Sequence, residues 1–545
     1  MALRRREFFT ASTASLALGA ATSMTSCAPP SVYEAPSNGS PFHLGVLSGL
    51  HSETEVVLWT RLSPDLAPGV GEIRWEVATD PQCVHLVQNG RCPVGPVADW
   101  TAKVLVGGLE PDTNYWYRFV VDDQPSAVGR ARTLPVVTAS PSSLKLVFGS
   151  CQNWGSGFYN AWTAIANEAV DAVVWLGDYI YETPSLGSYI GDLGAVLNAT
   201  QVRRDTLPEA TTLDLYRAKY KLYRSDPELQ RAHGAHPFVP VWDDHEFKND
   251  YNRMDLSREA SRAAAAYQAW FEYMPVMAIS GNQIYRSLRW GRLAELTMID
   301  TRQYRDPQAN GHSSDTGTRW VGVGTISDEA QEPNRTILGP TQRAWLLDRL
   351  GAAQQDDVTW KLIGNQVMIA PVRPIDLDTA ELRQLVGELP RHNGVYINMD
   401  SWESYRWERD LLLEFLRTEQ IRNVSFLTGD IHMFWQQTLR SDYDDDSSPY
   451  VANDFVGGSI SSPGLNVLGE DFARGLEQYP GQWSPSFRYV DFRRNGYGLV
   501  DLTPESMSVS YRATNVTTPR LPTVTSARFT MTNGQPYPSL ELPNP

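Results

Sequence analysis

Hydrophobic and polar residues alternate in short runs from residue 41 to residue 138, and turns that contain Gly or Pro separate these runs. The alternation is clearest in EVVLWTRL (55–62), IRWEVAT (73–79), AKVLVGGL (102–109) and NYWYRFVV (114–121). A period of two is typical of half-buried strands. We therefore predict an N-terminal all-β domain, a β-sandwich at 41–138, which ends at the small polar linker TASPSS (138–143).

From residue 143 to residue 545 the pattern changes to apolar runs that alternate with amphipathic stretches. The apolar runs KLVFGSC (145–151), AVVWLGD (172–178), FVPVWDD (238–244) and VSFLTGD (424–430) each stop at a polar cluster. Helical periodicity marks RAAAAYQAWFEYM (262–274), PTQRAWLLDRL (340–350) and ERDLLLEFLRT (408–418). Strands that alternate with helices predict a layered α/β domain over 143–545.

The first thirty residues are expected to be a targeting signal rather than part of the fold. Arg4-Arg5-Arg6-Glu7-Phe8-Phe9 precedes a weakly apolar stretch and resembles a twin-arginine export signal, which would engage the machinery that exports folded proteins. Met24-Thr25-Ser26-Cys27 resembles a lipoprotein cleavage box, in which Cys27 would carry the lipid anchor. The alternative is ordinary cleavage nearby. Either way the protein is predicted to be exported, whether periplasmic, extracellular or lipid-anchored at the cell surface.

The charge of the chain restricts its partners. The formal net charge is −16, and no stripe rich in Lys and Arg offsets it. A surface that binds nucleic acid or anionic lipid without specificity is therefore not expected.

Three cysteines follow Cys27. Cys83 and Cys92 lie nine residues apart across a loop that contains Gly, so in an exported protein we expect that they can form a disulfide. Cys151 is then the odd thiol, either inert and buried or chemically active.

Potential metal ligands follow four of the predicted strands of the α/β domain. They are Cys151 after the first, Asp178 and Tyr181 after the second, Asp243, Asp244, His245, Glu246, Asn249 and Asp250 after the third, and Asp430 and His432 after the fourth. Ligands of open α/β sheets bind beyond the carboxyl ends of strands, so we expect these four ends to converge. Each signal alone is weak, because a lone Asp or Cys after a strand is usually a turn or core residue.

The donor types indicate which metals such a site would hold. Oxygen donors suit hard cations, whereas a thiolate and a phenolate suit ferric iron. The set therefore favours ferric iron beside calcium or manganese. The four strand ends carry these donors, and the intervening strands are expected not to.

The ordered motifs resemble the PhoD-type alkaline phosphatases of the metallophosphoesterase superfamily. They are GVLSGLHSETEVVLWTRL, FGSCQ, WLGDYIYE, YRAKYKLYRSDPELQ, WDDHEFKND, LGPTQRAWL, GNQVM, LTGDIH, FVGGSISSPG and NGYGLVDLT. The resemblance implies a four-layer sandwich of two mixed sheets flanked by helices. In front of it the resemblance implies an N-terminal fibronectin III or Ig-like module, in line with the turn and strand GLEPDTNYWYRF (108–119).

The resemblance also implies cofactors, one ferric iron and two calcium ions, with manganese or zinc as alternatives. Carried over by position, the iron ligands would be Cys151, Asp178 and Tyr181. The calcium ligands would be Asp178, Asp244, Asn249, Asp430 and His432. His245 falls where the superfamily keeps its catalytic histidine, so His245 and Asp178 are the predicted catalytic residues.

The expected function is that of an exported, metal-dependent phosphoric ester hydrolase that resembles alkaline phosphatase. A metal-bound hydroxide would attack phosphorus, and His245 would hydrogen-bond the transition state or protonate the leaving group. Two alternatives stay open. One is a phosphodiesterase that acts on phospholipid or on polymers like teichoic acid, and the other is a non-catalytic binding protein of the cell envelope.

Overall fold

The computed structural model describes residues 39–184, 202–309, 321–325, 328–376, 384–385 and 393–543, the last range with gaps at 444, 446, 479–480, 482–483 and 485. The predicted twin-arginine signal at 1–30 and the predicted lipid-bearing Cys27 lie outside these residues. No helix of the described part combines the length and the apolar character needed to cross a membrane.

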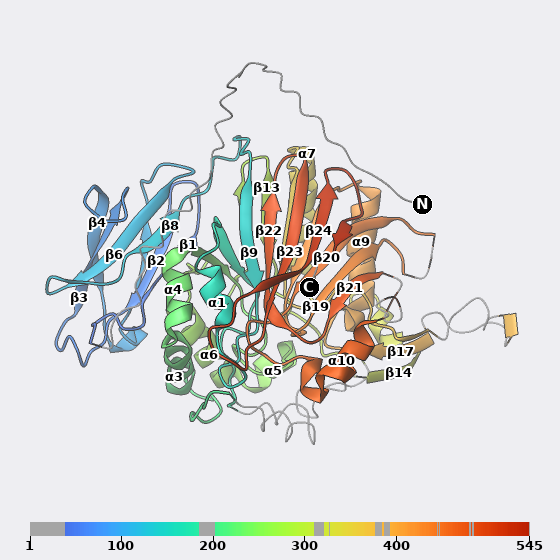
Figure 1. Ribbon diagram of the computed structural model, residues 1–545, viewed down its shortest axis with the longest axis horizontal. Helices are drawn as coiled ribbons and strands as arrows, with labels where there is room; N and C mark the ends of the chain where they lie inside the picture. The colour runs from blue at the N-terminus through green and yellow to red at the C-terminus, as the bar shows by residue number, and fades with distance from the viewer. Residues whose placement is uncertain are drawn as a thin grey trace, which may run out of the picture. The chain divides into compact units, whose positions relative to one another are not determined.

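A ten-stranded mixed sheet runs through the centre of the described chain (Figure 1). Its order is β25 (Ser539–Glu541), β24 (Val524–Thr532), β23 (Ser506–Thr514), β22 (Asn495–Leu502), β9 (Leu144–Gly149), β10 (Ala172–Trp175), β11 (Pro237–Pro240), β1 (Val46–Leu50), β2 (Val56–Arg61) and β5 (Thr101–Val106). The four strands β9, β10, β11 and β1 are parallel, so their carboxyl ends lie at one edge of the sheet.

A second, seven-stranded mixed sheet packs against the first. Its order is β12 (Arg286–Trp290), β13 (Ala294–Met298), β15 (Trp360–Asn365), β18 (Val424–Thr428), β20 (Tyr450–Gly457), β19 (Phe434–Arg440) and β21 (Phe487–Asp491). Phe148 and Trp175 of the larger sheet share one buried core with Leu362 and Leu427 of the smaller. Removing these apolar faces from water stabilises the pairing of the two sheets.

Helices cover the outer faces of both sheets. The larger sheet is contacted by α1 (Asn160–Ile165) and α4 (Pro227–Ala235), with α3 (Leu213–Arg224) and α6 (Ala260–Tyr273) beside them, and the smaller by α7 (Gly339–Gln355) and α9 (Arg406–Thr418). The described chain also contains α5 (Arg253–Arg258), α10 (Glu470–Glu477) and a small sheet of β14 (Val321–Thr325), β17 (Asn393–Ile397) and β16 (Ile375–Asp376). The four strands and three helices predicted in this α/β part are confirmed.

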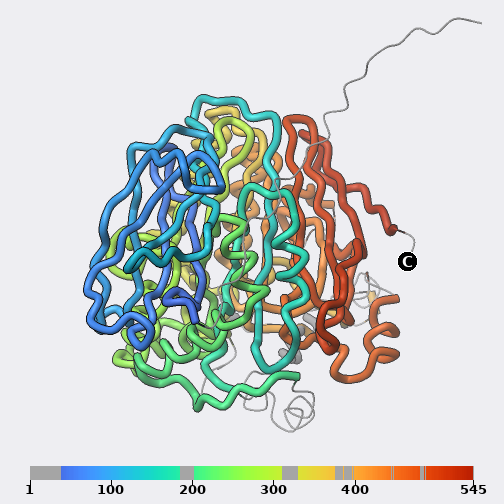
Figure 2. The backbone as a smooth tube through the Cα atoms, turned by 60° about the vertical axis from the view of Figure 1, so that its left-hand side comes forward, coloured from blue at the N-terminus to red at the C-terminus, as the bar shows by residue number. Residues whose placement is uncertain are grey.

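The N-terminal region is all-β, as predicted, and a second sheet forms its outer part. This sheet contains β4 (Leu86–Pro93), β3 (Glu72–Ala78), β6 (Asn114–Val121) and β7 (Gln124–Pro125), and β8 (Gly129–Arg132) pairs with β6. The strands β1, β2 and β5 instead extend the large sheet, because β1 pairs in parallel with β11. Figure 2 shows these blue N-terminal strands on one flank and the red C-terminal strands on the other. One continuous sheet therefore links the two predicted regions.

The expected disulfide between Cys83 and Cys92 is wrong. Both are free, buried thiols. In the β3–β4 hairpin Leu86 lies opposite Ala78 at the turn end, whereas Cys92 lies opposite Ile73 near the other end. Six residues of strand span about 20 Å, and disulfide formation needs Cα atoms within about 7 Å. The hairpin thus holds the two thiols apart.

Candidate metal centre

The four predicted strand ends meet at one edge of the two sheets. Cys151 follows β9, Asp178 follows β10, Asp244 follows β11, and Asp430 and His432 follow β18. Cys151, Asp178, Asp430 and His432 have left-handed backbone conformations, with φ between 57° and 66°. Non-glycine residues adopt this region at a cost in free energy, and such residues cluster at functional sites. The turned backbone marks the point where each strand stops.

A buried carboxylate ties two of these strand ends together. The Oε2 atom of Glu246 accepts hydrogen bonds from the backbone N–H of Asp178 at 3.0 Å and of Asp243 at 2.9 Å, and its Oε1 accepts from Tyr179 at 2.6 Å. Gly177, with φ +108°, allows the close approach, because a Cβ there would lie 2.3 Å from the Cβ of Asp243. Glu246 thus fixes the loops that carry Asp178 and Asp243.

The first donor group combines a thiol, a carboxylate, an imidazole and a phenol. Ligand atoms of Cys151, Asp178 and His432 lie within 4.8 Å of one another. The Tyr181 hydroxyl lies 2.9 Å from Asp178 Oδ2, 3.1 Å from His432 Nε2 and 2.6 Å from Ser462 Oγ. The other oxygen of Asp178, Oδ1, is buried and has no hydrogen-bond partner. An unpartnered carboxylate oxygen among such donors is what a bound cation would satisfy.

The orientation of His432 also suits a metal. Its Nδ1 lies 3.1 Å from the carbonyl oxygen of Pro463, which can only accept, so Nδ1 carries the proton. Burial, reinforced by the charge of His245, lowers the pKa of His432 to about 4. The ring is therefore neutral, and the Nε2 lone pair points into the first donor group.

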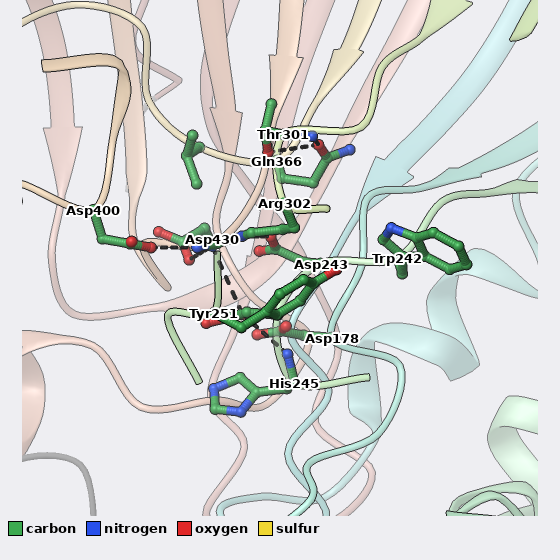
Figure 3. Close-up of polar contacts among 12 residues, drawn as sticks. Asp178, Trp242, Asp243, His245, Tyr251, Thr301, Arg302, Gln366, Asp400 and Asp430 are labelled. Carbon is green, nitrogen blue, oxygen red and sulfur yellow. Dashed lines mark hydrogen bonds and ion pairs between the residues drawn. The ribbon is translucent and has the colours of Figure 1, made fainter. Parts of the chain in front are cut away.

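A second group of carboxylates surrounds Arg302 (Figure 3). Oxygens of Asp243, Asp244 and Asp430 lie within 4.8 Å of one another. The guanidinium of Arg302 donates to Asp243, to Asp400 and, at 2.8 Å, to Asp430. Arg302 therefore already compensates part of the negative charge of this group.

Arg302, which lies in none of the predicted motifs, adds a fifth strand end to the site. It follows β13, in the segment IDTRQYRD (299–306). Arg305 of the same segment pairs with Asp400 at 2.8 Å. Asp400 also belongs to a third group with Asp244 and Asp250. The polar residues that follow the apolar run AELTMI (294–299) were the available signal for this fifth strand end.

His245 lies beside the first donor group and is held from two sides. Its Nδ1 is 2.7 Å from Glu182 Oε2, and its ring stacks on Tyr181 with 4.0 Å between centroids. Glu182 Oε1 also accepts the backbone N–H of Asn249 at 3.1 Å, which anchors the loop after β11. Burial alone would lower the pKa of His245, but nearby carboxylates, with Asp178 first, raise it well above its usual range.

The remaining donors need a cation to ionise. Burial, and after it the charge of Asp178, raises the pKa of the Cys151 thiol and of the Tyr181 phenol well above their usual ranges. A metal ion at this place would favour the thiolate and the phenolate. The residues therefore fit a resident metal, and the fold with this donor set defines a candidate metalloenzyme of the α/β class.

Comparison with known proteins identifies the class further. Residues 146–511 match the family model described as PhoD-like phosphatase, and residues 26–135 match that of the PhoD-like phosphatase N-terminal domain. The chain belongs to the PhoD-like phosphatase family, and it is a phosphoric ester hydrolase.

Two relatives cover most of the chain. Alkaline phosphatase D of Bacillus subtilis (strain 168) is 35% identical over 489 residues, which span 87% of this chain and 77% of the relative. The solved structure described as "Structure of PhoD" is 32% identical, has a TM-score of 0.79 and covers 93% of both chains. The family expected from the sequence motifs is thereby confirmed.

Proposed function

We propose that this chain is an exported alkaline phosphatase-like enzyme that cleaves phosphate esters at the candidate metal centre. The observation that carries the proposal is the first donor group, where Cys151, Asp178 and His432 lie within 4.8 Å and Asp178 Oδ1 has no partner. A buried set of thiol, phenol, imidazole and carboxylate donors without a cation would be costly to fold. A metal ion removes that cost.

The donor chemistry supports ferric iron at Cys151, Asp178 and Tyr181, with calcium at Asp244, Asn249 and Asp430. His432 was expected among the calcium ligands, but its Nε2 lies 3.1 Å from the Tyr181 hydroxyl, which favours the iron group. When bound, the metal ions would neutralise the phosphate oxygens and acidify an attacking water. Asp178 belongs to the first donor group with Cys151 and His432, and one of its oxygens also lies within 4.8 Å of ligand atoms of Asp244 and His245. This position would suit a carboxylate that helps to hold two cations.

The protein's own residues would position His245 and the carboxylates and move the proton. Glu182 and Tyr181 hold the His245 imidazole in one orientation at the edge of the donor groups. In the proposed reaction His245 hydrogen-bonds the transition state or protonates the leaving oxygen. Arg302 keeps Asp243 and Asp430 in place while positive charge is added around them.

The finer fold and the location belong to the same proposal. The two packed sheets with helices outside them support the four-layer metallophosphoesterase sandwich, and the outer N-terminal sheet supports the fibronectin III or Ig-like module. The twin-arginine motif supports export in folded form, with lipidation of Cys27 or ordinary cleavage as the two outcomes. Export after folding would let metal be acquired in the cytoplasm.

The test is a paired hydrolysis assay on the purified chain with p-nitrophenyl phosphate and bis-p-nitrophenyl phosphate, before and after treatment with a metal chelator. The proposal predicts turnover that is lost on chelation and preference for the monoester. Preference for the diester would select the phosphodiesterase alternative. No turnover of either ester by the folded, metal-loaded chain would refute the proposal.

A further inference from the structure

A cavity away from the metal centre lies along β12, the edge strand of the seven-stranded sheet. Its volume is about 480 Å³, and three arginines line it, Arg286 and Arg289 from β12 and Arg349 from α7. No residue that lines the cavity is acidic. In a chain with a net charge of −16 this is a local concentration of positive charge.

Two of the three arginines already have carboxylate partners. Arg289 pairs with Asp356 at 2.5 Å, and Arg349 pairs with Glu295 at 2.6 Å. The charges of Arg289 and Arg349 are therefore compensated within the protein, whereas Arg286 has no carboxylate partner among the described residues.

Arg286 is the uncompensated cation of the cavity. Its Nη1 donates to the carbonyl of Ile284 at 3.0 Å and its Nη2 to the carbonyl of Pro240 at 2.9 Å. Across the described residues no carboxylate pairs with it, and burial is the cause that lowers the pKa of Arg286 to about 10. Two backbone carbonyls thus fix the guanidinium, and its remaining N–H groups have no hydrogen-bond partner among the residues that the structure describes. A partly buried cation without a carboxylate partner gains free energy when an anion binds.

The rest of the wall is aromatic and aliphatic. The rings of Tyr285 and Trp345 are in contact, with 4.9 Å between centroids, and both line the cavity. Ile279 at the same cavity is 58% exposed. A ligand that fills this space would place a flat apolar group against the rings and a negative charge at Arg286.

We propose that this cavity binds small organic anions that carry a flat apolar group, such as aromatic sulfonates, carboxylates or phosphates, with Arg286 as the anion-binding residue. The site is separate from the metal centre and does not depend on the proposed function. Pro240 ends β11, three residues before Asp243, so Arg286 contacts the strand that leads to the metal centre.

The test is isothermal titration of naphthalene-1-sulfonate into the purified full chain. The wild type is expected to bind one equivalent, and Arg286→Gln is expected to weaken binding at least about tenfold through loss of one charge-assisted contact. Naphthalene-1-sulfonamide, which has no charge, is expected to bind as weakly to the wild type as the sulfonate binds to Arg286→Gln.

The control variant is Arg231→Gln on α4, an arginine paired with Glu228 at 2.9 Å and outside the cavity. It is expected to bind like the wild type. Arg286→Met, which also removes the charge, replaces the Gln variant if thermal unfolding shows that the latter is not folded. Absence of binding to the folded wild type, unchanged binding in the folded Arg286 variant, or equal weakening in Arg231→Gln would each overturn the proposal.

Discussion

Replacing Arg302 by Met tests how the carboxylates of the second group are held. Arg302 is fully buried and donates to Asp243, Asp400 and Asp430. After the change, Asp400 keeps Arg305 at 2.8 Å, but Asp243 loses its hydrogen bond to Arg302, and its Oδ2 atom is already without a partner. Asp243 is then a buried charge without compensation.

The size of the effect follows from this geometry. Removal of one partner of a buried ion pair costs about 3–5 kcal/mol, a large part of the roughly 5–15 kcal/mol that stabilises a typical domain. The assay is urea unfolding of chelator-treated wild type and Arg302→Met. An unfolding midpoint of Arg302→Met equal to that of the wild type would show that Arg302 does not stabilise these carboxylates.

The pH dependence gives the prediction a second readout. Burial raises the pKa of Asp243 to about 6 even beside Arg302, and loss of the guanidinium raises it further. A carboxyl group with a raised pKa binds a proton in the folded state that the unfolded state does not bind, so stability falls as pH rises from about 4 to above 6. The deficit of Arg302→Met is therefore expected to be larger at pH 8 than at pH 5.

Three further changes address single features of the centre. Gly177→Ala should destabilise the chain by more than about 2 kcal/mol in urea unfolding, because the added Cβ would clash with Asp243. The control Gly281→Ala, also at positive φ but with no atom within 4 Å of the added Cβ, should destabilise it less. Equal losses of stability in the two variants would argue against the clash. His245→Ala should reduce kcat about 10²–10⁴-fold while metal content stays unchanged, and full activity would exclude its proposed role. Tyr181→Phe should remove any visible phenolate-to-iron absorption, and unchanged colour would exclude Tyr181 as a ligand.

The strand ends of the metal centre were predictable because their signal is local. Each apolar run that stops at Cys151, Asp178 or Asp430 is a buried strand. Parallel pairing of β9 with β10 brings the first two ends together, whereas Asp430 comes from β18 of the other sheet, which packs against the first. The pattern therefore placed the donors at one edge before any long-range contact was known. The role of each donor as a ligand stays a prediction.

Other parts of the centre depend on contacts that no local pattern encodes. Arg302 and Asp400 are 98 residues apart and meet only because the fold brings together the segments that follow β13 and β17, which belong to different sheets. Glu246 lies in the motif WDDHEFKND. Its side chain accepts hydrogen bonds from the backbone after two strands because β10 and β11 pair in parallel. A carboxylate in sequence does not reveal which N–H groups it will accept.

The N-terminal region also depends on long-range contacts that its sequence pattern does not encode. The strands were predictable from alternation, but the pairing of β1 with β11 joins residues almost 190 positions apart. The disulfide expectation failed for a related reason, since the spacing of Cys83 and Cys92 says nothing about the hairpin that separates them. Sequence spacing predicts contact only where the chain turns back between the two residues.

We expect Asp178 to hold the metal on which hydrolysis depends. The most direct measurement determines iron content and p-nitrophenyl phosphate hydrolysis together in wild type, Asp178→Ala and the control Asp471→Ala on exposed α10. We predict that Asp178→Ala stays folded and loses both iron and activity, while Asp471→Ala keeps both. Stoichiometric iron and full activity in Asp178→Ala would contradict the account.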